Sequence, residues 1–280
     1  MKSQQSGVAL VLVLWVITLL AVIAGNFAYS MRSEALISRN LMAAAQAQAV
    51  ADAGVQMAWF ELTKPPADPQ RWTANGLVRT VGVNGAALKI VIGNEYGKID
   101  INKGMDALRD GLFRSVGLSA EFSSGLLARL KLATAIPFES VDELRQVEGV
   151  TPEIYRLLAP SLTVYSGLPK INIASASRDV LMAIPGVNPA AVEQYLALRK
   201  VAMEAGQPLP VFAEGSQYDF NSGGRVTYSV ASIATLPDGT VAARKAVGRF
   251  TNNPHQPVQV LVWSDVLDPQ PTSAPTIALN

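Results

Sequence analysis

Residues 7–24 read GVALVLVLWVITLLAVIA and contain no charged side chain. Between Met1 and Met31 the only charge is Lys2, which precedes the apolar run. A helix over residues 8–29, with a rise of about 1.5 Å per residue, spans the ~30 Å hydrocarbon core of a bilayer. We therefore expect one membrane-spanning helix, with Lys2 on the cytoplasmic side and the rest of the chain on the other side.

Three kinds of N-terminal segment share this pattern. A secretory signal peptide ends in a cleavage site of small residues after the apolar run, but Ala43-Ala44-Ala45 lies far downstream. A plain membrane anchor requires only the apolar length. The Gly7-Val8 junction resembles the third kind, the class III leader of type IV pilins, in which a short polar leader ends in Gly and the apolar helix follows at once. That resemblance implies cleavage by prepilin peptidase after Gly7 and N-methylation of Val8.

The helical pattern continues beyond the apolar run. Residues 32–62 contain no Pro and a single Gly, which favours helix, and Pro65-Pro66 follow. Residues 77–97 are predicted to form two strands around an Asn84-Gly85 turn. Residues 103–205 have helical spacing, and residues 225–236, 240–251 and 257–266 alternate as strands do. A sheet laid on the second half of the long helix would bury that helix's apolar stripe.

This order of elements predicts an α+β fold, in which a long N-terminal helix packs on an antiparallel sheet and an all-α domain is inserted between the strands. Four features resemble the K-type minor pseudopilins (GspK family) of type II secretion systems. They are the Gly7-Val8 junction and the sequences GKIDIN at 97–102, PFESVDEL at 137–144 and KINIASA at 170–176. The resemblance extends from Gly7 to about Val266. It implies a prepilin leader (1–7), a transmembrane and amphipathic helix (8–62), a pseudopilin domain in two parts (63–101 and 206–267), an inserted α-helical domain (102–205) and a flexible tail (268–280).

The function that the resemblance implies is structural and not enzymatic. K-type subunits join I-type and J-type minor pseudopilins in a complex at the pseudopilus tip, prime assembly of the major pseudopilin and support export of folded proteins across the outer membrane. The expected location is the inner membrane, crossed once, with the globular region in the periplasm. Most pilins have Glu at the fifth position after cleavage, whereas this chain has Leu12, which fits a tip subunit with no neighbour above it. A minor pilin of a type IV pilus is the nearest alternative.

A second alternative is a membrane-tethered DNA-binding protein. Residues 140–158 and 175–198 each read as helix, Gly-Val-polar-Pro, helix, which resembles a helix-hairpin-helix repeat. Such a hairpin offers backbone N–H groups at a helix N-terminus to a phosphate. Each hairpin here keeps one Gly, residues 171–200 have a net charge of +1, and residues 140–158 are acidic. A DNA-binding face gathers several cations, so the repeats are expected to pack within the protein and no nucleic-acid partner is expected.

The composition excludes several kinds of site. Cysteine is absent and His255 is the only histidine, so no disulfide, thiolate site or histidine cluster is possible. K-type pseudopilins bind calcium through an Asp-rich stretch ahead of the Pro-Phe motif, but residues 127–138 (LARLKLATAIPF) lack it. Asp100 and Asn102 are spaced like ligands, yet two oxygens do not complete a shell of six to eight. We therefore expect no catalytic residue, metal or cofactor.

Overall fold

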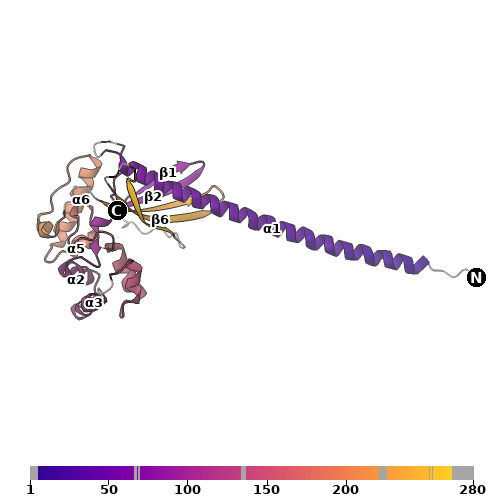
Figure 1. Ribbon diagram of the computed structural model, residues 1–280, viewed down its shortest axis with the longest axis horizontal. Coiled ribbons are helices and arrows are strands. Elements are labelled where there is room, and N and C mark those ends of the chain that lie inside the picture. The colour runs from indigo at the N-terminus through magenta and orange to yellow at the C-terminus, as the bar shows by residue number, and fades with distance from the viewer. Residues whose placement is uncertain are drawn as a thin grey trace, which may run out of the picture.

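The computed structural model describes residues 6–65, 68, 70–133, 137–220, 226–251, 253 and 255–266. The predicted long helix is confirmed as α1 (Ser6–Thr63), which is 58 residues long and unbroken. It ends just before Pro65, whose ring and missing N–H do not fit a helix interior. Figure 1 shows α1 lying on the globular region with its C-terminal part and projecting alone with its N-terminal part.

The predicted antiparallel sheet is also confirmed. Its five strands run in the order β1-β2-β5-β6-β7, and each neighbouring pair is antiparallel. The bounds are β1 (Val78–Val83), β2 (Ala86–Asn94), β5 (Thr227–Thr235), β6 (Val241–Phe250) and β7 (Val258–Asp265). Asn84 (φ 49°) and Gly85 (φ 81°) form the turn between β1 and β2. Positive φ at both positions matches the twist of a two-residue hairpin, and Asn and Gly adopt it at the lowest cost.

One face of the sheet packs against the C-terminal half of α1. The helix contributes Ala51, Val55, Ala58, Trp59 and Leu62, and the strands contribute Leu88, Ile90, Ile92, Val230, Ala234 and Ala246. Gly54 allows this close approach, because a Cβ there would lie 2.2 Å from Ser232 Oγ. The Trp59 ring also meets the Trp263 ring edge to face, with centroids 5.6 Å apart. This packing fixes which side of α1 faces the sheet.

The chain between β2 and β5 forms a second packed unit, here called the helical block (residues 95–220). It has its own apolar core, which includes Leu108, Leu112, Phe113, Leu144 and Val180. Figure 1 places it at the end of the molecule away from the N-terminus. Its elements are η1 (Glu95–Gly97), β3 (Ile99–Asp100), α2 (Asp106–Ser115), α3 (Ala120–Ala133), η2 (Val141–Gln146), α4 (Pro152–Leu158), η3 (Ala159–Ser161), β4 (Leu162–Thr163), η4 (Ile173–Ser175), α5 (Arg178–Met182), α6 (Pro189–Glu204) and η5 (Ala213–Tyr218).

Local details of the block differ from the predictions. The segment after Ser140, predicted as α-helix, is the 3-10 helix η2, and Ser140 and Glu143 form a capping box at its start. A short parallel pair, β3 with β4, joins Ile99 to Leu162 and was not predicted. Two residues are too few to give an alternating pattern, and the partner strand lies far along the chain.

A buried carboxylate joins the block to the sheet. Glu95 is 2% exposed, and its carboxylate accepts hydrogen bonds from Lys98 Nζ at 2.7 Å and Thr163 Oγ1 at 2.6 Å. Burial alone would raise the pKa of Glu95. The charge of Lys98 and the hydrogen bonds from Lys98, Ser229 and Thr163 outweigh burial, and the pKa is lowered. Glu95 is therefore ionised at neutral pH and links η1, β4 and β5.

Candidate membrane segment and assembly surfaces

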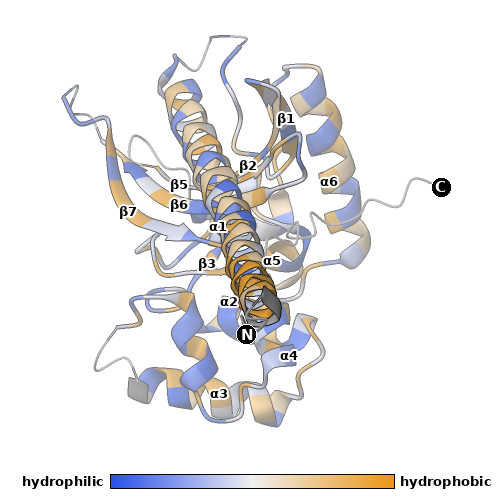
Figure 2. Cartoon of the chain, turned by 90° about the vertical axis from the view of Figure 1, so that its right-hand side faces the viewer, coloured by the Kyte–Doolittle hydropathy of each residue, from blue (hydrophilic) through white to orange (hydrophobic). Residues whose placement is uncertain are grey.

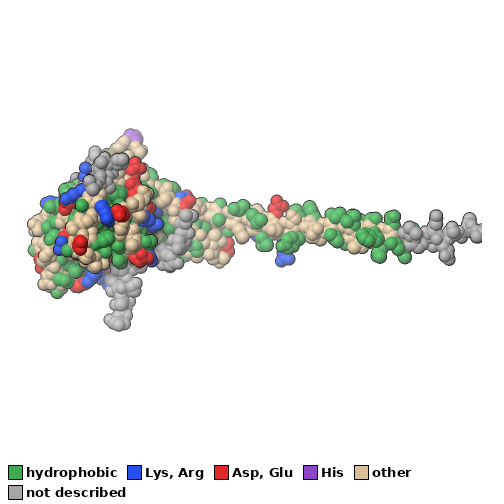
Figure 3. Space-filling model, turned by 90° about the horizontal axis from the view of Figure 1, so that it is seen from below, with side chains coloured by type: hydrophobic (Ala, Val, Ile, Leu, Met, Phe, Trp, Pro, Cys, Tyr) green, Lys and Arg blue, Asp and Glu red, His purple; other side chains and the backbone are tan. Residues whose placement is uncertain are grey.

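The N-terminal half of α1 exposes a long series of apolar side chains. No charged residue occurs between residues 8 and 31, and the mean hydropathy of its most apolar 18-residue window is 2.5. In Figure 3 the projecting helix carries apolar side chains along its length and few charged ones. The larger exposed residues are Leu10, Val11, Leu12, Val13, Leu14, Trp15, Val16, Ile17, Leu19, Leu20, Val22, Ile23, Phe27, Tyr29, Met31, Leu36, Ile37, Leu41 and Met42. Within the described residues, α1 is the one helix long and apolar enough to cross a membrane.

The hydropathy of α1 changes along its length. Figure 2, seen along this helix, shows its N-terminal part as hydrophobic and its later part as mixed. The first charges are Arg32, Glu34 and Arg39, and Ala47 is the first fully buried apolar residue. An apolar surface of this size on a chain by itself indicates lipid or other helices as its environment.

The predicted processing residues lie at the start of this helix. The Gly7-Val8 peptide bond is in the first turn of α1, which begins at Ser6. Leu12 follows about one turn later, and 62% of its surface is exposed. Cleavage after Gly7, methylation of Val8 and the significance of Leu12 therefore stay predictions.

A polar contact fixes α1 on the sheet beside the apolar packing. Arg244 of β6 is 9% exposed and donates from Nε to Asp52 of α1 at 2.5 Å. Its Nη1 donates to Asp265 of β7, and Gln48 Nε2 of α1 donates to the same carboxylate at 2.8 Å. The Arg244 guanidinium also lies 5.3 Å from the Trp263 ring centroid. This arrangement orients α1 about its own axis, and so sets the direction of its exposed side chains relative to the sheet.

The first hairpin-like repeat contacts Arg129 of α3. Its turn contains Gly149 with a φ of 87°, and Thr151 caps α4 by accepting a hydrogen bond from Ile154 N–H. Arg129 of α3 donates to the Glu148 carbonyl at 2.6 Å, and its Nη1 would lie 2.9 Å from a Cβ added at Gly149. This contact ties the turn at Gly149 to α3, so the repeat packs against a neighbouring helix of the same chain.

The second repeat has its helix N-terminus occupied by a carboxylate of the same chain. Gly186 has a φ of 75°, and Asn188 caps α6 by accepting a hydrogen bond from Ala190 N–H at 3.0 Å. The Asn188 N–H itself donates to Glu214 Oε2 at 2.9 Å. An internal anion thus lies where the hairpin would bind a phosphate. The contact argues against DNA binding at this repeat, and its partners are too far apart in sequence to be found from a local motif.

The carboxylate of Asp100, which is spaced like a metal ligand in the sequence, is engaged by protein hydrogen bonds. Asp100 Oδ1 accepts hydrogen bonds from the N–H groups of Asn102 and Lys103, both at 2.9 Å. Its Oδ2 accepts from Ser166 Oγ at 3.0 Å and Gly167 N–H at 2.7 Å. Four protein donors therefore use both oxygens. Within the part of the chain that the structure describes, no three or more His, Cys, Asp or Glu residues are grouped to hold a metal ion.

The single histidine stands apart from these features. His255 is exposed in the connection between β6 and β7, where its N–H donates to Asn253 Oδ1 at 3.0 Å. This contact, two residues back along the chain, belongs to a local turn.

The fold is pseudopilin-like. A search of solved structures matches this chain to a chain in the crystal structure of the GspK-GspI-GspJ complex from the type 2 secretion system of enterotoxigenic Escherichia coli. The match covers 85% of this chain and 99% of that chain, with a TM-score of 0.52 and 13% sequence identity. At this identity the likeness concerns the fold. The sequence matches no protein-family model and no curated protein.

The match includes both parts of the molecule. The match covers 85% of this chain, and the helical block is nearly half of it, so the matched region extends into the block as well as the helix and the sheet. The expected arrangement of a long helix, an antiparallel sheet and helices between the strands is therefore confirmed as the architecture.

Proposed function

We propose that this chain is a K-type minor pseudopilin of a type II secretion system, acting at the tip of the pseudopilus. In this role it primes pseudopilus assembly and supports export of folded proteins across the outer membrane. The observation that carries the proposal is the division of α1 into a bare apolar half and a half packed on the sheet, in a fold shared with a chain of the GspK-GspI-GspJ complex. That fold belongs to a non-enzymatic structural component, so the proposed role includes no catalysis.

The exposed half of α1 would make the contacts of assembly. In the inner membrane, residues 8–29 would cross the bilayer once and leave the globular region in the periplasm. Residues 30–45 would continue the helix outside the bilayer, and their exposed side chains include Leu36, Ile37 and Leu41. Outside lipid, burial of these apolar side chains against the helices of I-type, J-type and major pseudopilins would be favourable.

The leader and Leu12 complete the proposal. Prepilin peptidase would cut after Gly7, remove the leader with its Lys2 charge and leave Val8 as the methylated N-terminus. In a subunit with Glu at the position of Leu12, an ionised carboxylate in lipid would need a cationic partner. Leu12 needs none, which fits a subunit at the end of the assembly. The division of the chain into 1–7, 8–62, 63–101, 102–205, 206–267 and 268–280 is proposed with it.

The test is the N-terminus of the full chain. The chain is expressed in a membrane with and without a prepilin peptidase, and the intact mass and N-terminal peptide are measured. We expect a product that begins at N-methylated Val8 when the peptidase is present and an intact Met1 chain when it is absent. A Gly7→Asp variant should stay uncut, and Ser6→Ala, one residue away, should be cut as the parent is.

Two outcomes would overturn the proposal. Processing of the Gly7→Asp variant together with normal secretion would contradict the hypothesis of a pilin-type leader. Cleavage after residue 25 would indicate an ordinary signal peptide. If Val8 is the N-terminus, co-purification of the processed chain with I-type and J-type subunits from the same membrane separates a type II secretion role from a type IV pilus role.

A further inference from the structure

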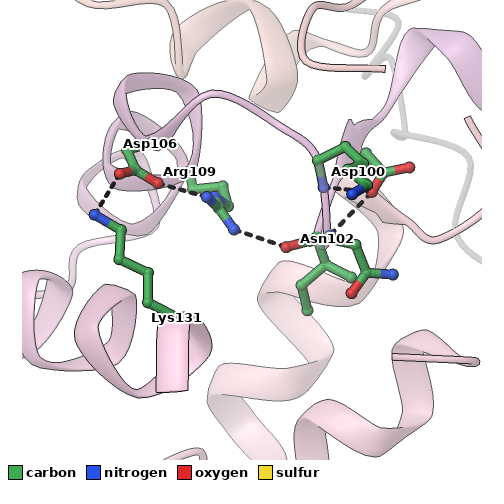
Figure 4. A network of polar contacts seen from close by, with 7 residues as sticks. Asp100, Asn102, Asp106, Arg109 and Lys131 are labelled. Carbon is green, nitrogen blue, oxygen red and sulfur yellow. Dashed lines mark hydrogen bonds and ion pairs between the residues drawn. The ribbon is translucent and has the colours of Figure 1, made fainter. Parts of the chain in front are cut away.

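Asp106, the first residue of α2, lies between two cationic side chains from different elements. Its Oδ1 accepts a hydrogen bond from Arg109 Nη2 at 2.5 Å, and its Oδ2 is 2.6 Å from Lys131 Nζ, near the end of α3 (Figure 4). The Arg109 side chain is 8% exposed, and its Nη1 donates to the Ile101 carbonyl at 2.7 Å. One carboxylate therefore joins α2, α3 and the segment that follows β3.

A second contact holds the chain on the other side of Lys131. Asn102 Oδ1 accepts a hydrogen bond from Phe138 N–H, and Asn102 Nδ2 donates to the Phe138 carbonyl, both at 2.9 Å. The two bonds form a reciprocal pair between a side-chain amide and a backbone. Residues 101–106 are thereby held both to Lys131, near the end of α3, and to Phe138.

Two cationic side chains flank the one carboxylate of this group. The hydrogen bond from Lys131 is the largest effect on Asp106, and with the charge of Arg109 it lowers the pKa of Asp106 despite partial burial. A divalent cation at Asp106 would have to displace Lys131 while the nearby guanidinium of Arg109 repelled it. Asp100, the other nearby carboxylate, already accepts four protein hydrogen bonds.

We propose that this group of side chains, Asp106, Arg109, Lys131 and Asn102, called here the clasp, holds the helical block together in place of the calcium ion that the resemblance to K-type pseudopilins implies. It ties Lys131, near the end of α3, and Phe138 to the start of α2, so that the helical block is stable without a divalent cation. The inference does not depend on leader processing or on a position at the pseudopilus tip, because it concerns only the folding of the block.

The test measures thermal unfolding of the full chain in detergent, in one buffer with excess EDTA and in another with excess calcium. We expect the two melting temperatures to agree within about 1 °C. The Lys131→Met variant should melt about 1–3 °C lower in both buffers, since it loses an ion pair that joins two helices. Lys131→Arg keeps the charge and should recover most of the loss.

The matched control is Arg114→Met. Arg114 pairs with Asp110 at 2.8 Å within α2 itself and is 58% exposed, so its removal costs one cation without separating two elements. Its melting temperature should fall by less than about 1 °C. Amide exchange in residues 120–133 should speed up in Lys131→Met and not in Arg114→Met.

Either of two results would overturn the inference. A rise of several degrees in the melting temperature of the parent chain on adding calcium would show that the block binds and needs the ion. Equal melting temperatures and equal exchange rates for Lys131→Met and Arg114→Met would show that the clasp does not hold α3 to α2.

Discussion

Replacing Gly54 by Ala tests how closely α1 packs on the sheet. In an ordinary helix interior this change adds about 1 kcal/mol of stability, because Ala loses less backbone entropy than Gly. Here the added Cβ would lie 2.2 Å from Ser232 Oγ and 3.2 Å from Leu88 Cδ2. Overpacking of this kind costs about 1–3 kcal/mol. The sum predicts a net loss of about 0–2 kcal/mol for Gly54→Ala.

The cost should depend on one atom, and a double-mutant cycle isolates it. Among the residues that the structure describes, Ser232 Oγ is buried without a hydrogen-bond partner, so Ser232→Ala alone should be neutral or slightly stabilising. In the Ser232→Ala background the nearest remaining contacts of the new Cβ are at 3.2 Å. Gly54→Ala should then be less harmful or become stabilising, with a coupling energy of about 1–2 kcal/mol.

The assay is thermal unfolding of the four chains in detergent, where 1 kcal/mol corresponds to about 2–4 °C in a chain of this size class. The control is Gly25→Ala in the same helix, where a Cβ would meet nothing within 4 Å. It should leave unfolding of the globular region unchanged. Additive effects of Gly54→Ala and Ser232→Ala would refute the reasoning, since they would mean that the helix and sheet do not meet at this point.

Two further predictions concern charge. Because the folded-state pKa of Glu95 is lowered, its contribution to stability is present above about pH 4.3 and is lost as the pH falls through the folded-state value. Glu95→Gln should therefore flatten the acid side of a stability profile measured by urea unfolding between about pH 5 and 3. An unchanged profile would contradict the buried link between Glu95 and the sheet. Because Glu214 accepts the hydrogen bond from the Asn188 N–H, the full chain should show no salt-sensitive DNA binding. Glu214→Ala should lower the free energy of unfolding by about 1 kcal/mol. If fluorescence anisotropy showed a DNA affinity that falls at least tenfold between low and moderate salt, it would favour a DNA-binding helix-hairpin-helix instead.

Features with a local cause were predictable from the sequence. The apolar run after Gly7 predicts α1 by composition, and Asn84-Gly85 predicts the β1–β2 turn because both residues tolerate positive φ. Thr151 and Asn188 predict helix starts because their side chains cap the backbone N–H groups of the next turn. Each of these signals lies within a few residues of the structure it specifies.

Features that join distant segments were not predictable. Arg244 reaches Asp52 across 192 residues, and Lys131 meets Asp106 only because α2 and α3 pack together. Glu214 reads in the sequence as an ordinary surface carboxylate, yet it completes the turn at Asn188. Such pairs have no periodicity or spacing of their own, since tertiary packing alone brings them into contact. The absence of an Asp-rich stretch could be seen in the sequence, but the contacts among the side chains of the clasp could not be predicted from it.

The pairing of Asn94 with Tyr228 has a consequence for how such a molecule can be altered. The last residue of β2 and the second residue of β5 are direct partners in the sheet, although the whole helical block lies between them in sequence. The chain thus leaves the sheet and returns to it at nearly the same place. Removing the block and joining these two ends by a short turn would leave an ordinary hairpin, with α1 and the other strands undisturbed. The block can therefore lengthen, shorten or change its chemistry as an interchangeable part, while the frame that carries α1 stays the same.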